Sequence, residues 1–244
     1  MTDRPPVLVA PDAFGGALRA PVVAAAIGRG LEAAGLRPPD LCPVAGGGAG
    51  TIEVLLPALG GETGAGFALI EEGGTALVEA AGALEETAER LRAAAATGPA
   101  VVVLAAADAG ARHAAAALAA AGNLGGARPV VLIAPHDGPA QLAPPAKAVP
   151  GPAFVLDALG VDARLRAARA VVVGTGRLDE RALRGAVEGE LAVRARQAGV
   201  PCHAVVGANA LTLFDTRILD LQRIVEAATV AAIESGTRAI AEVV

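Results

Sequence analysis

The sequence predicts an α/β fold in which helices cover a mainly parallel sheet. Short aliphatic or β-branched runs alternate along the chain with longer segments of helical periodicity, which is the pattern of βαβ units. In addition, 54% of the 244 residues are apolar, which is enough to bury a sizeable core.

The N-terminal elements alternate strand and helix. Residues 7–10 are aliphatic and predict a strand, and residues 20–34 follow as a helix, with apolar residues at helical spacing and Pro21 at an early helical position. Residues 41–44 predict a short strand that meets the glycine cluster AGGGAG. A helix is expected at residues 51–59, because Thr and a nearby Glu favour a helix start.

The rest of the chain continues the alternation. Residues 67–70 and 75–79 predict a hairpin across EEGG, and residues 84–96 predict a helix with its charges on one side. The proline-rich residues 135–152 predict a connection. The remaining expected elements are strands at 101–104, 130–134, 170–173 and 203–206, and helices at 112–121, 153–159, 180–198 and from 224 onward.

Composition excludes several classes of function. A formal net charge of −5 and the lack of basic clusters interleaved with aromatics argue against a nucleic-acid partner. No apolar run is long enough for a bilayer span, so we expect no membrane association and a cytoplasmic location. Cys42 and Cys202 lack metal-ligand spacing and are expected to be buried thiols, with no metal site. The single lysine, Lys147, is expected to be a solvated loop charge.

Several segments resemble type I glycerate kinases. VLVAPDAFGGALRA and PVAGGGAGTIEVLLPALGGE are similar to the family's APDSFKGS and ADGGEGT motifs, in the same order and spacing. TALVEAAGA resembles TAVIEMA, and FVLDALGVDARLRAARAVVVGTGRLDERALRG resembles VLDALGLEERLADADLVITGEGRLD, which is the most specific match. The resemblance covers nearly the whole chain, which is shorter than the family pattern between Gly122 and Phe154.

The resemblance implies a two-domain architecture. The main parallel-sheet, Rossmann-like α/β domain would comprise residues 1–83 and 151–244, and residues 84–150 would form a smaller inserted α/β domain. In the family, glycerate and nucleotide are held in the cleft between the two domains.

The first loops depart from the family motifs. Asp12 and Phe14 match, but Ala13, Gly15 and Ala17 replace serine, lysine and serine. In the glycine loop the family's two acids correspond to Gly46 and Ala49. The backbone N–H groups there can form an anion nest, although a plain tight turn explains the glycines equally well. By resemblance, Asp12, Phe14 and four loop glycines with the following threonine are candidate substrate-binding residues. That loop set is Gly46, Gly47, Gly48, Gly50 and Thr51.

The middle loops are also rewritten. Alanines replace most of the family's GGSATNDGG loop, leaving Asp108, Arg112 and His113 as its polar content. Arg112 and His113 could contact an anion, but we favour a helix start with Asp108 as its cap. His136 follows a strand end and could serve in acid–base chemistry, or it is an ordinary loop histidine. His203, in a predicted strand, is expected to pack or to lie at the surface.

The best-preserved polar group is in GTGRLDERALRGA. It keeps Arg177 and Asp179, the candidate catalytic pair, and Thr175 replaces a family glutamate and joins the candidate substrate-binding residues. Ala186 stands where the family has a lysine. The Arg and Asp could bind and orient a small hydroxy acid, or they pair with each other and cap the next helix.

These losses predict a noncatalytic descendant that binds a small carboxylate or a protein partner, including a second copy of the chain. Phosphoryl transfer depends on positioning and on neutralising charge, and both loop lysines and both loop carboxylates of the family motifs are missing. No cofactor is expected on this interpretation. The alternative is an active kinase that uses ATP and magnesium to convert glycerate to phosphoglycerate.

Overall fold

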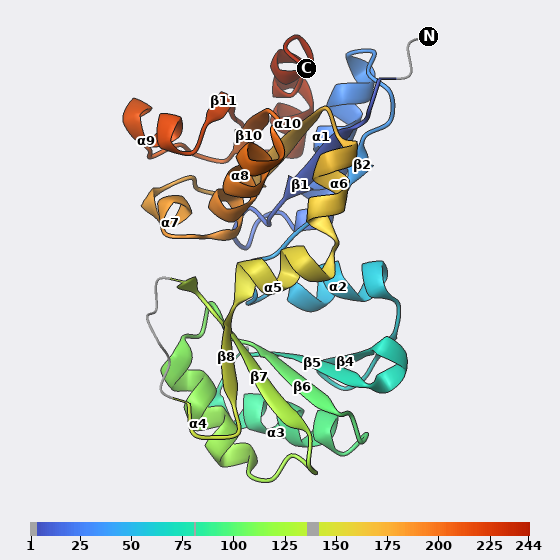
Figure 1. Ribbon diagram of the computed structural model, residues 1–244, viewed down its shortest axis with the longest axis vertical. Coiled ribbons are helices and arrows are strands. Elements are labelled where there is room, and N and C mark those ends of the chain that lie inside the picture. Colours follow the sequence, from blue (N-terminus) through green and yellow to red (C-terminus); the bar gives the residue numbers. More distant parts are fainter. Residues whose placement is uncertain (1–3, 81, 136–141) are drawn as a thin grey trace. The chain divides into compact units, whose positions relative to one another are not determined.

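A computed structural model describes residues 4–80, 82–135 and 142–244, and it divides into two compact units. Unit 1 contains residues 1–44 and 160–244, and unit 2 contains residues 45–159. Each unit is a sheet with helices on both faces (Figure 1). The α/β class is therefore as the sequence predicts.

Unit 1 is built on a fully parallel five-stranded sheet in the order β11-β10-β9-β1-β2. Its strands are β1 (Val7–Pro11), β2 (Asp40–Leu41), β9 (Ala170–Thr175), β10 (Cys202–Val206) and β11 (Leu221–Glu226). Its helices are α1 (Ala20–Ala33), α6 (Val161–Ala167), α7 (Glu180–Leu183), α8 (Val187–Ala198), α9 (Leu213–Ile218), α10 (Val230–Gly236) and α11 (Arg238–Ala241). Strand β1 from the N-terminal segment pairs with β9 from the C-terminal segment, so both segments share one sheet.

Aliphatic side chains at alternate strand positions of unit 1 pack against its helices and form a buried core. Val9, Val172 and Val205 pack against Ile27 of α1 and Ile233 of α10. Helix α8 packs on β9 and β10, and α6 packs beside it. Cys42 and Cys202 are buried free thiols, as the sequence predicts.

Unit 2 is built on a six-stranded sheet in the order β3-β4-β5-β6-β7-β8, in which β3, β4 and β5 are antiparallel neighbours and β5 to β8 run parallel. The strands are β3 (Glu62–Thr63), β4 (Phe67–Ile70), β5 (Thr75–Glu79), β6 (Val101–Ala105), β7 (Arg128–Ile133) and β8 (Lys147–Pro150). The helices are α2 (Thr51–Leu59), η1 (Glu71–Gly73), α3 (Leu84–Ala95), α4 (Ala111–Ala121) and α5 (Gly151–Ala158).

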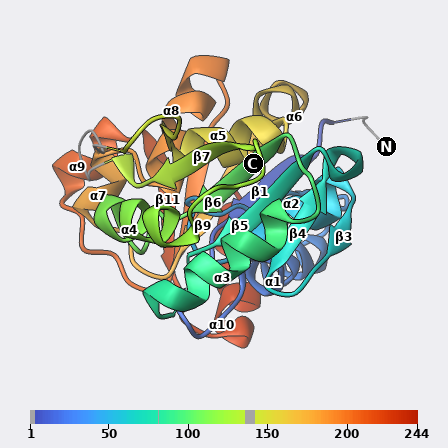
Figure 2. The same ribbon diagram turned by 90° about the horizontal axis from the view of Figure 1, so that it is seen from below.

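Helices α3 and α4 lie side by side over one face of this sheet (Figure 2). Their buried residues include Leu91 and Ala117, which pack with Val102 and Leu104 of β6. Helices α2 and α5 contact each other and cover the other face of the same sheet. Helix α2 packs on β4 and β5, and α5 packs on β7 and β8.

The unit boundaries differ from the sequence prediction, which assigns residues 45–83 and 151–159 to the main domain. Strand β5 pairs along its whole length with β6, so the β4–β5 hairpin belongs to the sheet of unit 2. Helices α2 and α5 cover that sheet, so they also belong to unit 2.

Several elements differ from the sequence prediction. The helix expected at 180–198 is two helices, because Gly185 between them has φ +90°. The helix expected from residue 224 begins only at α10, because residues 221–226 pair with β10 as an edge strand. Lys147 lies in strand β8, not in a structureless connection, although its residue is exposed as expected.

Candidate functional site

In unit 1, the loops after β1 and β9 meet at the point where the strand order reverses. The chain leaves β1 for β2 on one side, whereas β9, β10 and β11 extend the sheet on the other. Open α/β sheets place their ligands at such a position, outside the carboxyl ends of the strands. The Asp12 N–H donates to the Gly174 carbonyl at 2.9 Å, which ties the two loops together.

Glycine permits the close approach of these two loops. A Cβ added at Gly176 would lie 2.9 Å from Phe14 Cα, so the second loop can pass the first only without a side chain there. Gly15, at the position of the family's lysine, has φ +57°. A lysine would be strained in this left-handed backbone.

The sequence-predicted residues of unit 1 fall into two groups. Asp12, Thr175, Arg177 and Asp179 follow the carboxyl ends of β1 and β9. Phe14 does not present its ring to a ligand, because the side chain is 6% exposed and packs in the hydrophobic core. The buried ring of Phe14 therefore anchors the start of the loop and does not line a ligand site.

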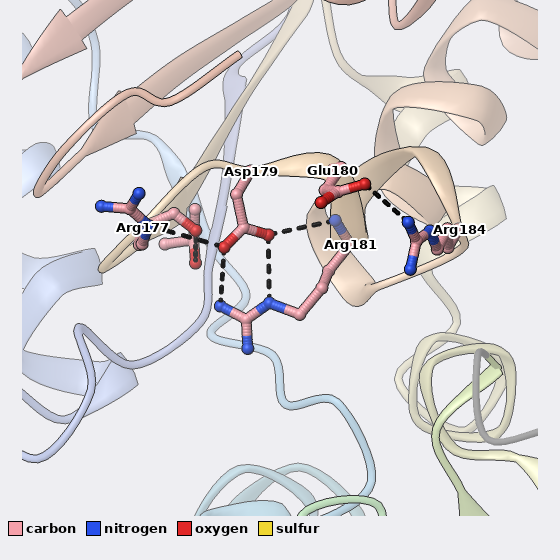
Figure 3. Close-up of polar contacts among 6 residues, drawn as sticks. Arg177, Asp179, Glu180, Arg181 and Arg184 are labelled. Carbon is pink, nitrogen blue, oxygen red and sulfur yellow. Dashed lines mark hydrogen bonds and ion pairs between the residues drawn. The ribbon is translucent and has the colours of Figure 1, made fainter.

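Asp179 is held by two arginines (Figure 3). It caps α7 by accepting from the Arg181 N–H at 3.0 Å, and its carboxylate also accepts from Arg181 Nε at 3.0 Å and Nη2 at 3.2 Å. Arg177 Nε lies farther away, at 3.6 Å. The side-chain bond from Arg181 is the largest of the effects that lower the pKa of Asp179.

Among the described residues, Arg177 is one of two cations beside Asp179. Arg181 is the closer partner, and Arg184 lies one turn farther along, paired with Glu180. The sequence offered one signal for Arg181, its place in the first turn after a capping aspartate. One of the two alternatives for this segment is that Arg177 and Asp179 pair with each other and cap the next helix. The structure contains both the pair and the cap.

Glu188 is a second carboxylate of this region that the sequence analysis missed. It lies in the first turn of α8 and is only 7% exposed. Burial raises its pKa, and Arg181 and Asp179 act on it in opposite directions. The two carboxylates thus have pKa values displaced in opposite directions within one loop–helix segment.

In unit 2, the glycine loop already holds carboxylates of the chain itself. The Ala49 N–H donates to Asp108 Oδ2 at 2.7 Å, and the Ile52 N–H donates to Glu79 Oε1 at 2.8 Å. A Cβ added at Gly48 would lie 2.1 Å from Asp108 Oδ2, so the aspartate rests directly on the loop. Asp108 therefore does not cap α4, whose N-cap is Gly110.

Gly47 and Thr51 are closely packed in this region. Gly47 has φ +90° and would place a Cβ 2.4 Å from Gly151 Cα. Thr51 is fully buried, and its hydroxyl donates to the Gly48 carbonyl at 2.7 Å, closing the turn. Gly46 and Gly50 belong to the same loop, but both have open space where a side chain would be.

Glu79 ends β5 and lies against the start of α2. Burial raises the pKa of its carboxyl, and hydrogen bonds from the backbone N–H groups of Ile52 and Gly50 oppose that rise. A carboxylate at a helix N-terminus is favoured by the helix dipole. The only sequence signal for this contact was a polar residue at the end of an apolar strand.

The remaining histidines and the middle-loop arginine are not brought into either group. His113 lies 3.3 Å from the Thr87 hydroxyl through Nε2, and Arg112 is exposed. His136 lies outside the described residues. His203 is 2% exposed within β10, so it is a packed residue and not a surface one.

With both loops described, the chain can be compared with known proteins. A glycerate kinase family model matches residues 7–127 and 81–242. The chain belongs to this family. No described helix has the length and hydrophobicity needed to cross a membrane.

Structural comparison supports the same fold. The crystal structure of a "putative glycerate kinase 2" from Salmonella typhimurium LT2 matches with a TM-score of 0.69 and 18% identity, covering 98% of this chain and 96% of that one. No curated protein sequence matches. At this identity the structural match shows the fold, and the two-domain α/β architecture expected from the resemblance is confirmed at that level.

Proposed function

We propose that this member of the glycerate kinase family does not transfer phosphate and instead binds a small carboxylate on the same scaffold. One observation carries the proposal: the N–H groups of Ala49 in the glycine loop and of Ile52 in the first turn of α2 already donate to Asp108 and Glu79. A loop of this kind binds an anion through free backbone N–H groups. Internal carboxylates occupy these two donors and add negative charge where a phosphate would approach.

The loops lack two of the positive charges that would neutralise a bound triphosphate. The positions of the family's loop lysines are Gly15 and Ala186. Without these charges a triphosphate is poorly neutralised, since phosphoryl transfer relies on electrostatic stabilisation.

Asp179 is also poorly suited to accept a proton. Its lowered pKa keeps it ionised but makes it a weak base, because a general base works best with a pKa near the working pH. Arg177 remains 60% exposed and only loosely paired, so its guanidinium can still receive a carboxylate in bidentate geometry. A small acid at the carboxyl end of β9 is therefore the ligand that this segment supports.

The alternative is an active glycerate kinase. It is favoured by family membership and by Glu188, whose raised pKa beside a strongly ionised Asp179 is a pattern of acid–base sites. The two candidates make opposite predictions for turnover, so one assay separates them.

The first measurement is product formation with ATP, magnesium and glycerate, followed by mass spectrometry of phosphoglycerate. We expect none above a control without protein. Turnover that Asp179→Asn abolishes would establish the kinase instead.

The second measurement tests the glycine loop directly. Asp108→Ala frees the Ala49 N–H and removes one negative charge, so affinity for pyrophosphate should rise by about 10- to 100-fold, as expected for one charge-assisted hydrogen bond. Glu89→Ala is the matched control, because it removes an exposed carboxylate from α3 of the same unit. Equal pyrophosphate affinity in the wild type and both variants, measured by calorimetry, would show that Asp108 does not block the loop.

A further inference from the structure

A cavity of about 620 Å³ lies at the amino-terminal edge of the unit 1 sheet. Its walls include His203 at the start of β10, Arg223 and Gln222 of β11, Asp220 before β11, and Arg196 of α8. Because β9, β10 and β11 are parallel, this edge is opposite to the one that Arg177 and Asp179 follow. The cavity is therefore separate from the candidate site described above.

His203 is the unusual member of this cavity. Its side chain is 2% exposed, and neither ring nitrogen has a hydrogen-bond partner among the described residues. Unpaired buried polar atoms are rare because they cost free energy. Burial first, and then the charge of Arg223, lower the pKa of the ring, which is therefore neutral at neutral pH. A neutral imidazole offers one N–H donor and one acceptor nitrogen.

Two arginines supply positive charge to the same cavity. Arg223 is the direct neighbour of His203 in the β10–β11 register, so both side chains project to the same face of the sheet. In the described part of the chain, no hydrogen bond or ion pair engages the Arg223 guanidinium. The Nη1 N–H of Arg196 donates to the Ile218 carbonyl at 2.9 Å, which fixes the guanidinium. The other N–H groups of this guanidinium remain available to a ligand.

The charge of the cavity selects the ligand. Asp220 accepts from Gln222 Nε2 at 2.8 Å and offsets one arginine, so two arginines and one aspartate leave a formal charge of +1 on the ionised lining side chains. One carboxylate balances this charge, whereas a phosphate dianion exceeds it. The acceptor nitrogen of His203 requires a donor on the ligand, which a hydroxyl group provides.

We propose that this cavity binds a small monocarboxylate that carries a hydroxyl group, with the carboxylate on Arg223 and the hydroxyl on His203. Guanidinium and carboxylate match in bidentate geometry, and the hydroxyl can both donate to and accept from the imidazole. The site goes beyond the proposed function, because it does not involve the loops that follow β1 and β9.

Ring-nitrogen NMR of the full-length, ¹⁵N-histidine-labelled protein tests the proposal, because the chain has only three histidines. The probes are L-lactate and propionate, which differ by the hydroxyl alone, and inorganic phosphate. We expect saturable shifts of the His203 signals with a lactate Kd on the order of 1 mM, and about tenfold weaker binding of propionate because one hydrogen bond is missing. His203→Gln assigns the signals.

Two variants locate the binding. Arg223→Gln should abolish the lactate-induced shift, and Arg177→Gln, at the opposite edge of the same sheet, should leave it unchanged. Absence of a His203 shift up to about 50 mM lactate, which is far above the expected Kd, would overturn the proposal. Equal binding of propionate or phosphate would overturn the ligand class, and loss of the shift in Arg177→Gln but not in Arg223→Gln would move the ligand to the other edge. None of these results depends on phosphotransfer.

Discussion

Replacing Glu79 with alanine should lower the free energy of unfolding of unit 2. In Glu79→Ala, the Ile52 N–H loses a 2.8 Å bond to a carboxylate at the start of α2. A hydrogen bond to a charged group contributes about 1.5–3 kcal/mol, and a carboxylate near a helix N-terminus adds about 0.3–1 kcal/mol. Relief of the desolvated charge offsets part of this, so we expect a loss of roughly 1–3 kcal/mol.

Glu79→Gln separates the charge from the hydrogen bond. The amide oxygen can still accept from the Ile52 N–H, and the desolvation of a charge is removed, so at pH 7 this variant should lie within about 1 kcal/mol of the wild type. Urea unfolding followed by circular dichroism measures both variants, because the chain has no Trp or Tyr for intrinsic fluorescence. Hydrogen exchange at α2 assigns the change to unit 2.

The pH dependence has a definite sign. Because burial raises the folded-state pKa of Glu79 above its ordinary value of 4.5, the folded state binds the proton more tightly than the unfolded state. The associated stability is fully present below that ordinary value and is lost as the pH rises through the raised pKa. Glutamine cannot titrate, so the stability of wild type relative to Glu79→Gln should increase between pH 7 and pH 5. Parallel pH profiles, or a Glu79→Ala loss below about 0.5 kcal/mol, would refute this account of the buried carboxylate.

Two further predictions concern the glycine loop and helix α9. Gly47→Ala should destabilise unit 2 by more than about 1 kcal/mol, because φ is +90° and the new Cβ would lie 2.4 Å from Gly151 Cα. Gly50→Ala, in the same loop with left-handed φ +85°, ψ −4° and open space, should show only the smaller backbone cost, and equal thermal shifts would contradict this. We also propose that α9 mediates self-association, because its Leu213 and Phe214 are 82% and 71% exposed, so Phe214→Ser should lower the sedimentation coefficient of an assembled wild type, and a monomeric wild type would be evidence against the proposal.

Much of the fold was predictable because its central strands are continuous aliphatic runs. Strands β1, β6 and β9 are nearly fully buried, and a continuous run of valines is typical of a strand that is covered on both faces of a parallel sheet. Strand β11 was not predictable, since LQRIVE is partly exposed along its length and pairs only with β10. Its conformation is set by that pairing, which is a tertiary contact and leaves no periodic signal in the segment itself.

The candidate site was predictable in its positions but not in its partners. Asp12, Arg177 and Asp179 could be placed from the rule that ligands bind beyond the carboxyl ends of parallel strands. The contact of Asp108 with Ala49 spans 59 residues of sequence, and that of Glu79 with Ile52 spans 27. No local pattern specifies such pairs, because β5 and β6 carry both acids to the glycine loop only once the sheet has formed.

The same chemistry links the two altered loops. In unit 2, two carboxylates lie on backbone donors of the kind that would receive an anion, and in unit 1 an arginine lies on the carboxylate that the family motif retains. A group that binds a ligand must be left without a partner in the free protein, which costs stability when the group is buried. A chain released from selection for that ligand can lower its free energy by pairing such groups internally. On the proposed function, the ion pair of Arg181 with Asp179 and the contact of Asp108 with Ala49 are pairings of this kind, and they stabilise loops that have no lysine at Gly15 or Ala186.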